Sequence, residues 1–141
     1  MLNILIAEDD LDDLVAFKEA LGEVLPKFNI THARNGVECL NLLLVQPPPD
    51  MIFLDVQMPL KNGIQCLQSI QNQHALAGIP VIMLSTSANM GDVDASYDNG
   101  ATLYLVKPTD VKALAVALKG TFRLLGRPKK DLLIKENFVV Q

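Results

Sequence analysis

The chain has 141 residues, of which half are hydrophobic and a fifth are charged, and its formal net charge is −4. This length and this balance fit one globular domain with a single core and exclude a disordered chain. No apolar run approaches the roughly 20 residues of a membrane helix, and no basic stretch before an apolar core marks a secretory signal. We therefore expect a cytoplasmic protein that makes no contact with a membrane.

The charge is distributed unevenly along the chain. Residues 1–118 hold 14 acids and 6 bases, a balance of −8, whereas residues 119–141 hold 6 bases and 2 acids, a balance of +4. Because an acidic body repels the phosphates of a nucleic acid, we expect no direct DNA binding. The basic end could contact an anionic partner or form an ordinary solvated surface, and the sequence leaves both interpretations open.

Apolar runs and helical stripes alternate along the chain. Short apolar runs bounded by turn residues indicate buried strands, and apolar residues three or four apart indicate amphipathic helices. Pro26 ends the first helix, whereas Asn35 and Asp110 cap two later ones. The pattern predicts, in chain order, a strand at 2–7, a helix at 11–25, an edge strand at 28–33, a helix after Asn35, a strand at 51–54, a helix from Gly63, a strand at 80–85, a weak helix at 90–98, a strand at 102–106 and a helix after Asp110.

Five strands alternating with five helices, with the central strands apolar throughout, predict an α/β fold. The expected architecture is a doubly wound, five-stranded parallel sheet with helices on both faces. We expect this domain over residues 1–125, followed by an extension at 126–141 that is basic and carries two short apolar patches. The extension could add an edge strand, dock on the body or mediate self-association. It is too short for a helix-turn-helix, so we expect no output domain in it.

Polar residues follow the apolar runs at the carboxyl ends of four predicted strands. Ligands of an open parallel sheet bind at this edge, so we expect these residues to share one site. In strand order they are Glu8, Asp9 and Asp10, then Asp55, then Ser85 and Thr86, and finally Lys107.

Clustered carboxylates repel one another strongly unless a cation neutralises them. Hard oxygen ligands in small number suit Mg²⁺, and the sequence has neither the spacing of a calcium-binding EF-hand loop nor a His/Cys set for zinc. Asp10 has a competing role as a helix cap, because acids before a helix complement its dipole. Glu8 and Asp9 are therefore the expected metal pair, together with Asp55.

An aspartate beside Mg²⁺ and a lysine can attack a phosphoryl group and become an acyl phosphate. Phosphoryl transfer needs mainly in-line positioning and neutralisation of charge on the transferring oxygens. On this hypothesis Asp55 accepts the phosphoryl group, and Ser85 and Lys107 bind its other oxygens. Each of these residues alone is more typical of a turn or a surface position, so the hypothesis depends on their combination.

Four segments together resemble the receiver domain of two-component response regulators: EDD at 8–10, DVQMPLKNG at 55–63, STSA at 85–88 and YLVKP at 104–108. They come in the family's order and spacing within about residues 1–122. The resemblance implies a sheet of strand order 2-1-3-4-5 and a stand-alone response regulator. It also implies a signalling phosphoacceptor rather than an enzyme, and a histidine kinase or histidine phosphotransfer protein as its partner.

The resemblance assigns the metal and phosphate chemistry to individual residues. Glu8 and Asp9 correspond to the acidic pair, Asp55 to the phosphoacceptor, and the backbone carbonyl of Gln57 to a further Mg²⁺ ligand. Gln57 and Ser87 occupy the positions that flank the phosphoryl group, so they are expected to tune its hydrolysis.

The resemblance also assigns a conformational switch. Ser85 and Tyr104 correspond to the two switch residues and Lys107 to the family's lysine, whose bond to Pro108 is expected to be cis. Phosphorylation is expected to draw Ser85 inward and to let Tyr104 rotate into the space. This would change the face made by the fourth helix, the fifth strand and the fifth helix, which then binds a protein partner or a second copy in a homodimer.

Two alternative functions belong to other classes of protein. A flavodoxin-like electron carrier shares the sheet, but the acids at 8–10 would repel a flavin phosphate. A pseudo-receiver, which is an interaction module that is never phosphorylated, stays open as the alternative.

Overall fold

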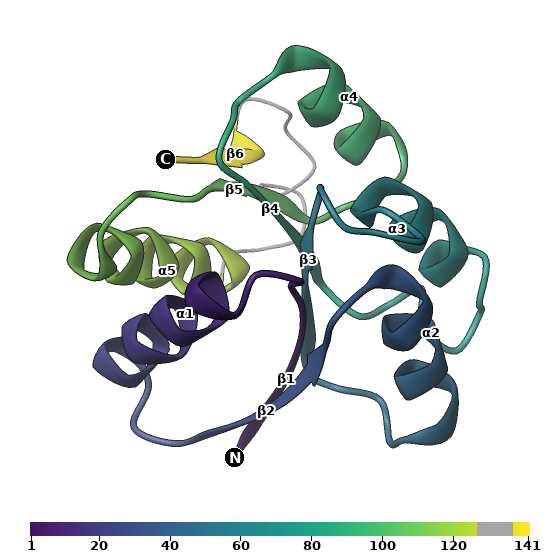
Figure 1. Ribbon diagram of the computed structural model, residues 1–141, viewed down its shortest axis with the longest axis horizontal. Helices are drawn as coiled ribbons and strands as arrows, with labels where there is room; N and C mark the ends of the chain where they lie inside the picture. The colour runs from purple at the N-terminus through teal and green to yellow at the C-terminus, as the bar shows by residue number, and fades with distance from the viewer. Residues whose placement is uncertain (127–136) are drawn as a thin grey trace.

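One parallel sheet forms the centre of the computed structural model, which describes residues 1–126 and 137–141 (Figure 1). The strands pair in the order β2-β1-β3-β4-β5-β6, and every pair is parallel. The predicted order of the first five strands is confirmed. The strands are β1 (Leu2–Ala7), β2 (Phe28–Ala33), β3 (Met51–Asp55), β4 (Val81–Ser85), β5 (Leu103–Val106) and β6 (Val139–Val140).

Helices cover both faces of the sheet, which confirms the doubly wound α/β architecture. Helices α1 and α5 lie together on one face, and α2, α3 and α4 lie on the other (Figure 1). Within the described ranges, no helix is both long enough and apolar enough to cross a bilayer. The helices are α1 (Leu11–Val24), α2 (Gly36–Val45), α3 (Gly63–Gln71), α4 (Met90–Asp98) and α5 (Val111–Leu125).

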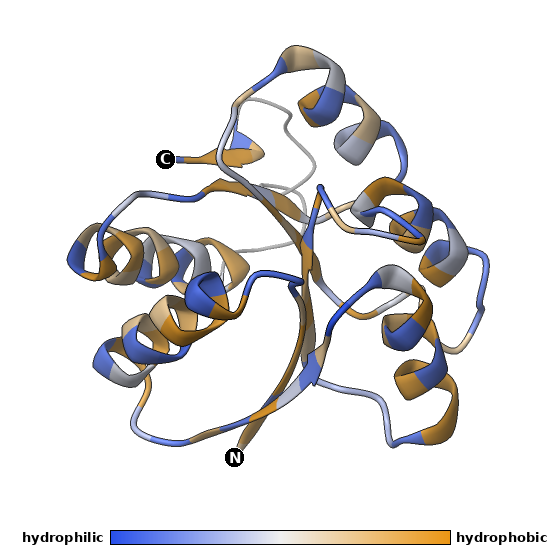
Figure 2. Cartoon of the chain, viewed as in Figure 1, coloured by the Kyte–Doolittle hydropathy of each residue, from blue (hydrophilic) through white to orange (hydrophobic). Residues whose placement is uncertain are grey.

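The central strands are buried on both of their faces, as their sequences predict. Every residue of β3 and β4 is buried. Phe53 packs on the α1–α5 side, where its ring meets that of Phe17 edge-on at 4.9 Å, whereas Ile52 and Leu54 pack on the opposite side. Since successive side chains of a strand point to opposite faces, a strand covered on both must be apolar throughout. Figure 2 shows these strands as hydrophobic and the outer helix faces as mixed.

Side-chain caps fix the starts of the helices at the predicted residues. An Asp10 carboxylate oxygen accepts hydrogen bonds from two amides in the first turn of α1, at 2.9 and 3.1 Å. Asn35 and Asp110 each accept one amide hydrogen bond, at 2.8 Å, at the starts of α2 and α5. Each cap satisfies amides that have no partner within the helix. Asp10 therefore acts as the N-cap of α1.

The sixth strand is a departure from the five-stranded prediction. Val139–Val140 pairs with β5 at the edge of the sheet. Phe138, just before it, is 1% exposed and packs edge-on against Tyr97 of α4, with ring centroids 5.3 Å apart. The sequence left three roles open for the extension. The part of it that the structure describes forms an edge strand, which is one of these three. The remainder of the extension, residues 127–136, lies outside the described residues.

Candidate functional site

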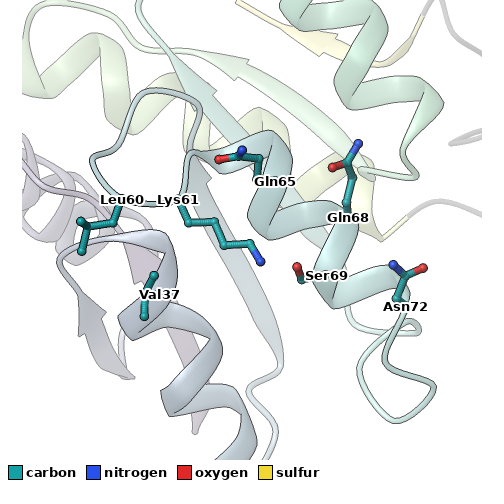
Figure 3. A pocket seen from close by; sticks show the side chains of 7 residues that line it. All are labelled: Val37, Leu60, Lys61, Gln65, Gln68, Ser69 and Asn72. Carbon is teal, nitrogen blue, oxygen red and sulfur yellow. The ribbon is translucent and has the colours of Figure 1, made fainter.

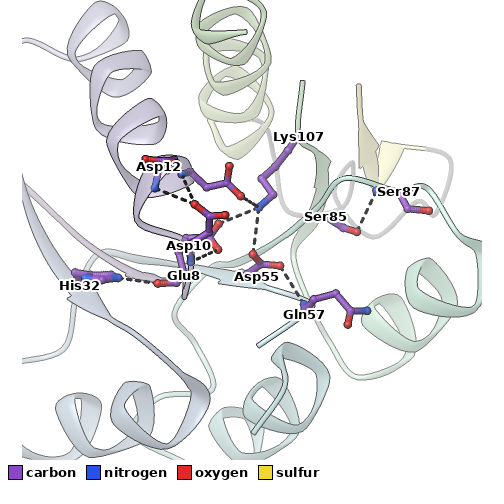
Figure 4. Close-up of polar contacts among 10 residues, drawn as sticks. Glu8, Asp10, Asp12, His32, Asp55, Gln57, Ser85, Ser87 and Lys107 are labelled. Atoms are coloured by element: carbon purple, nitrogen blue, oxygen red, sulfur yellow. Dashed lines mark hydrogen bonds and ion pairs between the residues drawn. The ribbon is translucent and has the colours of Figure 1, made fainter. Parts of the chain in front are cut away.

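The polar residues predicted at the strand ends meet at one edge of the sheet (Figure 4). They surround a cavity of about 260 Å³ at the carboxyl ends of β1, β3, β4 and β5. The prediction that these side chains share a site is therefore met by the geometry. The cavity is lined by Glu8, Asp9, Asp10, Asp13, Asp55, Gln57, Ser85, Thr86 and Lys107.

A larger hollow lies elsewhere, between α2, α3 and the loop that precedes α3 (Figure 3). Its volume is about 460 Å³ and it contains no carboxylate, so it offers no donor set for a cation. Lys61 is the charged side chain among its lining residues. These residues are Val37, Leu60, Lys61, Gln65, Gln68, Ser69 and Asn72.

Lys107 is at the centre of the polar cavity. Its ammonium nitrogen lies 2.9 Å from Glu8 Oε1, 3.1 Å from Asp55 Oδ2 and 3.2 Å from Asp13 Oδ2. Burial of the ammonium lowers its pKa, but the hydrogen bond to Glu8 and the charge of Asp55 more than offset burial. The pKa of Lys107 therefore lies above its ordinary value, and the side chain keeps its positive charge.

Glu8 is the most deeply buried acid of the cavity, at 1% exposed. Burial of the carboxyl group, together with its hydrogen bond to Asp55, raises the pKa of Glu8 to about 8. Its backbone carbonyl lies 2.7 Å from Nε2 of His32 on β2, and because a carbonyl accepts, that nitrogen donates. His32 thus holds the acidic segment against the neighbouring strand, a contact that sequence reasoning missed.

Asp55 is held from two directions at the end of β3. Its Oδ2 faces Lys107 at 3.1 Å, and its Oδ1 accepts a hydrogen bond from the backbone amide of Gln57 at 3.0 Å (Figure 4). Gly63 lies directly behind it, where a Cβ atom would be 2.3 Å from the backbone oxygen of Asp55. The turn after β3 can therefore fold back on the strand end because Gly63 has no side chain.

Three carboxylates of the cavity form a donor set for a cation. One oxygen each from Glu8, Asp9 and Asp55 lie within 4.8 Å of one another, and Asp9 is exposed. Oxygen donors of this kind fit a hard divalent cation that keeps some of its water ligands. Gln57, predicted as a backbone ligand, lines the same cavity.

The expected switch residues are already connected by hydrogen bonds. The Ser85 hydroxyl accepts a bond from the Ser87 amide at 3.2 Å, and the Tyr104 hydroxyl donates to the Ser87 carbonyl at 2.8 Å. Tyr104 is fully buried, and burial raises the pKa of its hydroxyl. The Tyr104 side chain is therefore already inward in this structure, so the expected rotation would not start from an exposed position.

The expectation of a cis bond before Pro108 was wrong. No peptide bond among the described residues is cis. Trans is the lower-energy form of a bond preceding proline by roughly 0.5–1 kcal/mol. With the trans bond the Lys107 side chain already reaches both Glu8 and Asp55.

The comparison with known proteins decides the family. Residues 4–119 match the model of the response regulator receiver domain. The chain belongs to the response regulator receiver family. Receiver domains are signalling phosphoacceptors, and the order of the first five strands, the buried Asp55 and the acid cluster all agree with this membership.

Two similar proteins come from a cyanobacterium, Synechocystis sp. (strain ATCC 27184 / PCC 6803 / Kazusa). Response regulator Rcp1 is 32% identical over 123 residues, which cover 83% of this receiver chain and 84% of Rcp1. The DNA-binding dual master transcriptional regulator RpaA is 31% identical over 129 residues, which cover 90% of this chain and 52% of RpaA. The receiver chain thus spans about half of the length of RpaA.

Two solved receiver structures are similar to this chain. The Mn²⁺-bound form of Rcp1 gives a TM-score of 0.79 at 31% identity, covering 91% of this chain and 98% of that one. The phosphorylated cyanobacterial phytochrome response regulator RcpA gives a TM-score of 0.80 at 30% identity, covering 87% of this chain and 92% of that one.

Proposed function

We propose that this receiver domain is a signalling phosphoacceptor that takes a phosphoryl group on Asp55 from a histidine kinase or a histidine phosphotransfer protein. The observation that carries the proposal is the 3.1 Å contact between Asp55 Oδ2 and Lys107 Nζ beside the carboxylates of Glu8 and Asp9. Similarity to the phosphorylated RcpA structure supports it. The protein would act in the cytoplasm and turn over no substrate beyond its own phosphate.

The transfer is a displacement at phosphorus. A carboxylate oxygen of Asp55 forms a bond to phosphorus while the bond from phosphorus to the donor's imidazole nitrogen breaks, and the imidazole leaves with that electron pair. Lys107, already beside Asp55 and positively charged, binds an oxygen of the arriving group. Ser85, at the end of the neighbouring strand β4, offers its hydroxyl to another.

Mg²⁺ fits the oxygen donors of the cavity. It would be held by Glu8, Asp9, Asp55 and the backbone carbonyl of Gln57, and the similar Rcp1 structure is a Mn²⁺-bound form. When bound, such an ion neutralises charge on the phosphoryl oxygens. Gln57 and Ser87 lie beside the acceptor and the switch hydroxyl, respectively, so their side chains would tune how fast water removes the phosphate.

The signal would leave through α4, β5 and α5. Ser85 is joined to Tyr104 through the amide and carbonyl of Ser87, so a Ser85 hydroxyl drawn toward a phosphoryl group disturbs this chain of bonds. Helix α4 buries Val93 and Ser96 and is weakly anchored, which makes it easy to displace. The displaced face would bind a protein partner or a second copy.

Electrophoresis on a phosphate-binding gel tests the acceptor. With acetyl phosphate and Mg²⁺, we expect a shifted band for the wild type and for Asp98→Asn, which changes an exposed aspartate of α4. We expect no shifted band for Asp55→Asn. A shift that persists without Asp55 would place the phosphate elsewhere, and a wild type that never shifts would favour the pseudo-receiver.

A further inference from the structure

Asp13 is an acid of the cavity to which the family resemblance gives no role. It comes from the first turn of α1, and its Oδ2 lies 3.2 Å from Lys107 Nζ, across 94 residues of sequence. Together with Glu8 and Asp55 it gives the ammonium group three carboxyl partners. An ammonium has three hydrogens to donate, so each partner can take one.

Asp13 differs from the other two partners of Lys107 in what else it can bind. Glu8 and Asp55 belong to the carboxylate cluster that fits a cation, whereas Asp13 lies outside that cluster. Its side chain is 47% exposed, compared with 2% for Glu8 and 9% for Asp55. Asp13 can therefore hold the lysine while the two buried acids are engaged elsewhere.

Lys107 and a bound divalent cation would compete for the same two buried acids. Both carry positive charge, and the ammonium already lies within 3.1 Å of an oxygen of Glu8 and an oxygen of Asp55. Asp13, the third carboxylate, lies on the α1 side and attracts the ammonium, which weakens the interaction of Lys107 with these two oxygens. The strength of cation binding would then depend on a residue that is not itself a ligand.

We propose that Asp13 is a positioning residue, which draws the Lys107 ammonium toward α1 and so leaves Glu8 and Asp55 available to Mg²⁺. The inference rests on the proposed function, because it concerns the same Mg²⁺ site. Replacing Asp13 by Asn turns the lysine fully onto the buried acids and weakens Mg²⁺ binding. For a half-exposed ion pair we expect the Mg²⁺ dissociation constant to rise roughly three- to fivefold.

The chain offers a matched control in Asp12. It is the preceding residue in the same first turn of α1, so Asp12→Asn removes one negative charge from that turn, whereas Asp13 also lines the cavity. Among the described residues, the carboxylates that pair with Lys107 are those of Glu8, Asp13 and Asp55, not that of Asp12. Asp12→Asn therefore measures the loss of a negative charge from this turn without the loss of a Lys107 partner, and a Lys107→Met background measures how much of the Asp13→Asn effect acts through the lysine.

Isothermal titration calorimetry with Mg²⁺ alone measures the Mg²⁺ dissociation constant without any phosphorylation. We expect weaker binding in Asp13→Asn than in Asp12→Asn, and near wild-type binding in Asp13→Glu, which keeps a carboxylate at the position. In a Lys107→Met background, the effect of Asp13→Asn on Mg²⁺ binding should become smaller and approach that of Asp12→Asn. Equal affinities in the wild-type background, or an Asp13→Asn effect that is as large without Lys107 as with it, would overturn the role of Asp13.

Phosphorylation by acetyl phosphate at a series of Mg²⁺ concentrations gives the second readout. Asp13→Asn should raise the Mg²⁺ concentration for half-maximal phosphorylation by the same factor, and the rate at saturating Mg²⁺ should stay within about twofold. A lower rate at saturating Mg²⁺ with unchanged Mg²⁺ dependence would contradict the inference. A wild type that binds Mg²⁺ but takes no phosphate would contradict the proposed function, while the calorimetry would still decide the role of Asp13.

Discussion

The backbone amide of Tyr104 donates a hydrogen bond to the carbonyl of Phe138, 2.9 Å away, and the centres of their rings lie 6.2 Å apart. The aromatic residue at the expected switch position is thereby joined to the residue that immediately precedes β6. Phe138 also contacts Tyr97 of α4, so one ring touches two of the elements through which the signal would leave. The β5 edge of this face is covered by the chain's own end.

Phe138→Ala tests whether that end is packed in solution. Phe138 is 1% exposed, and truncating a buried phenylalanine costs about 3–5 kcal/mol of unfolding free energy. We expect a loss near the lower end, measured by urea unfolding, because β6 has only two residues. Leu44→Ala, at a residue 64% exposed, should change stability by less than about 0.5 kcal/mol. Equal midpoints for the two variants would show that β6 does not stabilise the fold.

Gly63→Ala should disturb the end of β3. The added Cβ would lie 2.3 Å from the Asp55 backbone oxygen and 2.9 Å from the Val56 Cα, so backbone must move. We expect a loss of about 1–3 kcal/mol in thermal unfolding and slower phosphorylation of Asp55. Gly22→Ala is the matched control on α1, where a Cβ meets nothing within 4 Å and should stabilise the helix by about 0.5–1 kcal/mol. A stabilised Gly63→Ala would contradict the close approach.

Ser96→Ala should stabilise the protein although it removes a polar group. Ser96 on α4 is fully buried, and its hydroxyl has no hydrogen-bond partner in the part of the chain that the structure describes. An unsatisfied buried polar group costs about 1–3 kcal/mol, so we expect a gain of about 1 kcal/mol in urea unfolding. Thr121→Ala is the contrast, because its buried hydroxyl donates to the Ala117 carbonyl at 2.9 Å, and its loss should destabilise. A destabilised Ser96→Ala would reveal a partner for the hydroxyl.

The pKa of Glu8 predicts that Mg²⁺ binding depends on pH. With a pKa of about 8, Glu8 holds a proton at neutral pH, and a cation must displace it. The affinity for Mg²⁺ should therefore rise by up to about tenfold per pH unit below pH 8 and level off above it. Calorimetry at pH 6.5, 7.5 and 8.5 in buffers of different ionisation enthalpy should show proton release. An affinity that does not change across this range would contradict the protonated Glu8.

The raised pKa of Glu8 also predicts how the free energy of unfolding changes with pH when no metal is bound. In the unfolded chain the Glu8 carboxyl keeps its ordinary pKa of 4.5, so between pH 4.5 and about 8 the folded protein binds a proton that the unfolded chain does not. Stability from this group is present at low pH and is lost as the pH rises toward 8. Glu8→Gln, which is neutral at every pH, should remove this part of the pH dependence from urea unfolding curves measured in EDTA.

Most of the fold was predictable because its signals are local. Strands such as Met51–Asp55, buried on both faces, have to be apolar runs, and helices such as α2 begin at side-chain caps such as Asn35. The meeting of Glu8, Asp55 and Lys107 followed from a single rule, that the carboxyl ends of parallel strands share an edge.

The features that were missed depend on distant parts of the chain. Strand β6, one of three roles that the sequence left open for the extension, was not singled out because it is two residues long and depends on the β5 edge being free to accept it. The bond from Asp13 to Lys107 depends on how α1 is rotated against the sheet, although an acid three residues after the Asp10 cap was a usable signal. The bond before Pro108 was expected to be cis from the family resemblance, but it takes the trans form that the local preference of about 0.5–1 kcal/mol favours.

The place of β6 also has a consequence for the edge of the sheet. Without Val139–Val140, β5 would be the last strand of the sheet, and its residues Leu103, Tyr104 and Leu105 are all apolar or aromatic. An open strand edge of this kind is a template for pairing with other chains. By pairing with β5, Val139–Val140 occupies the position at which a second chain could otherwise add a strand.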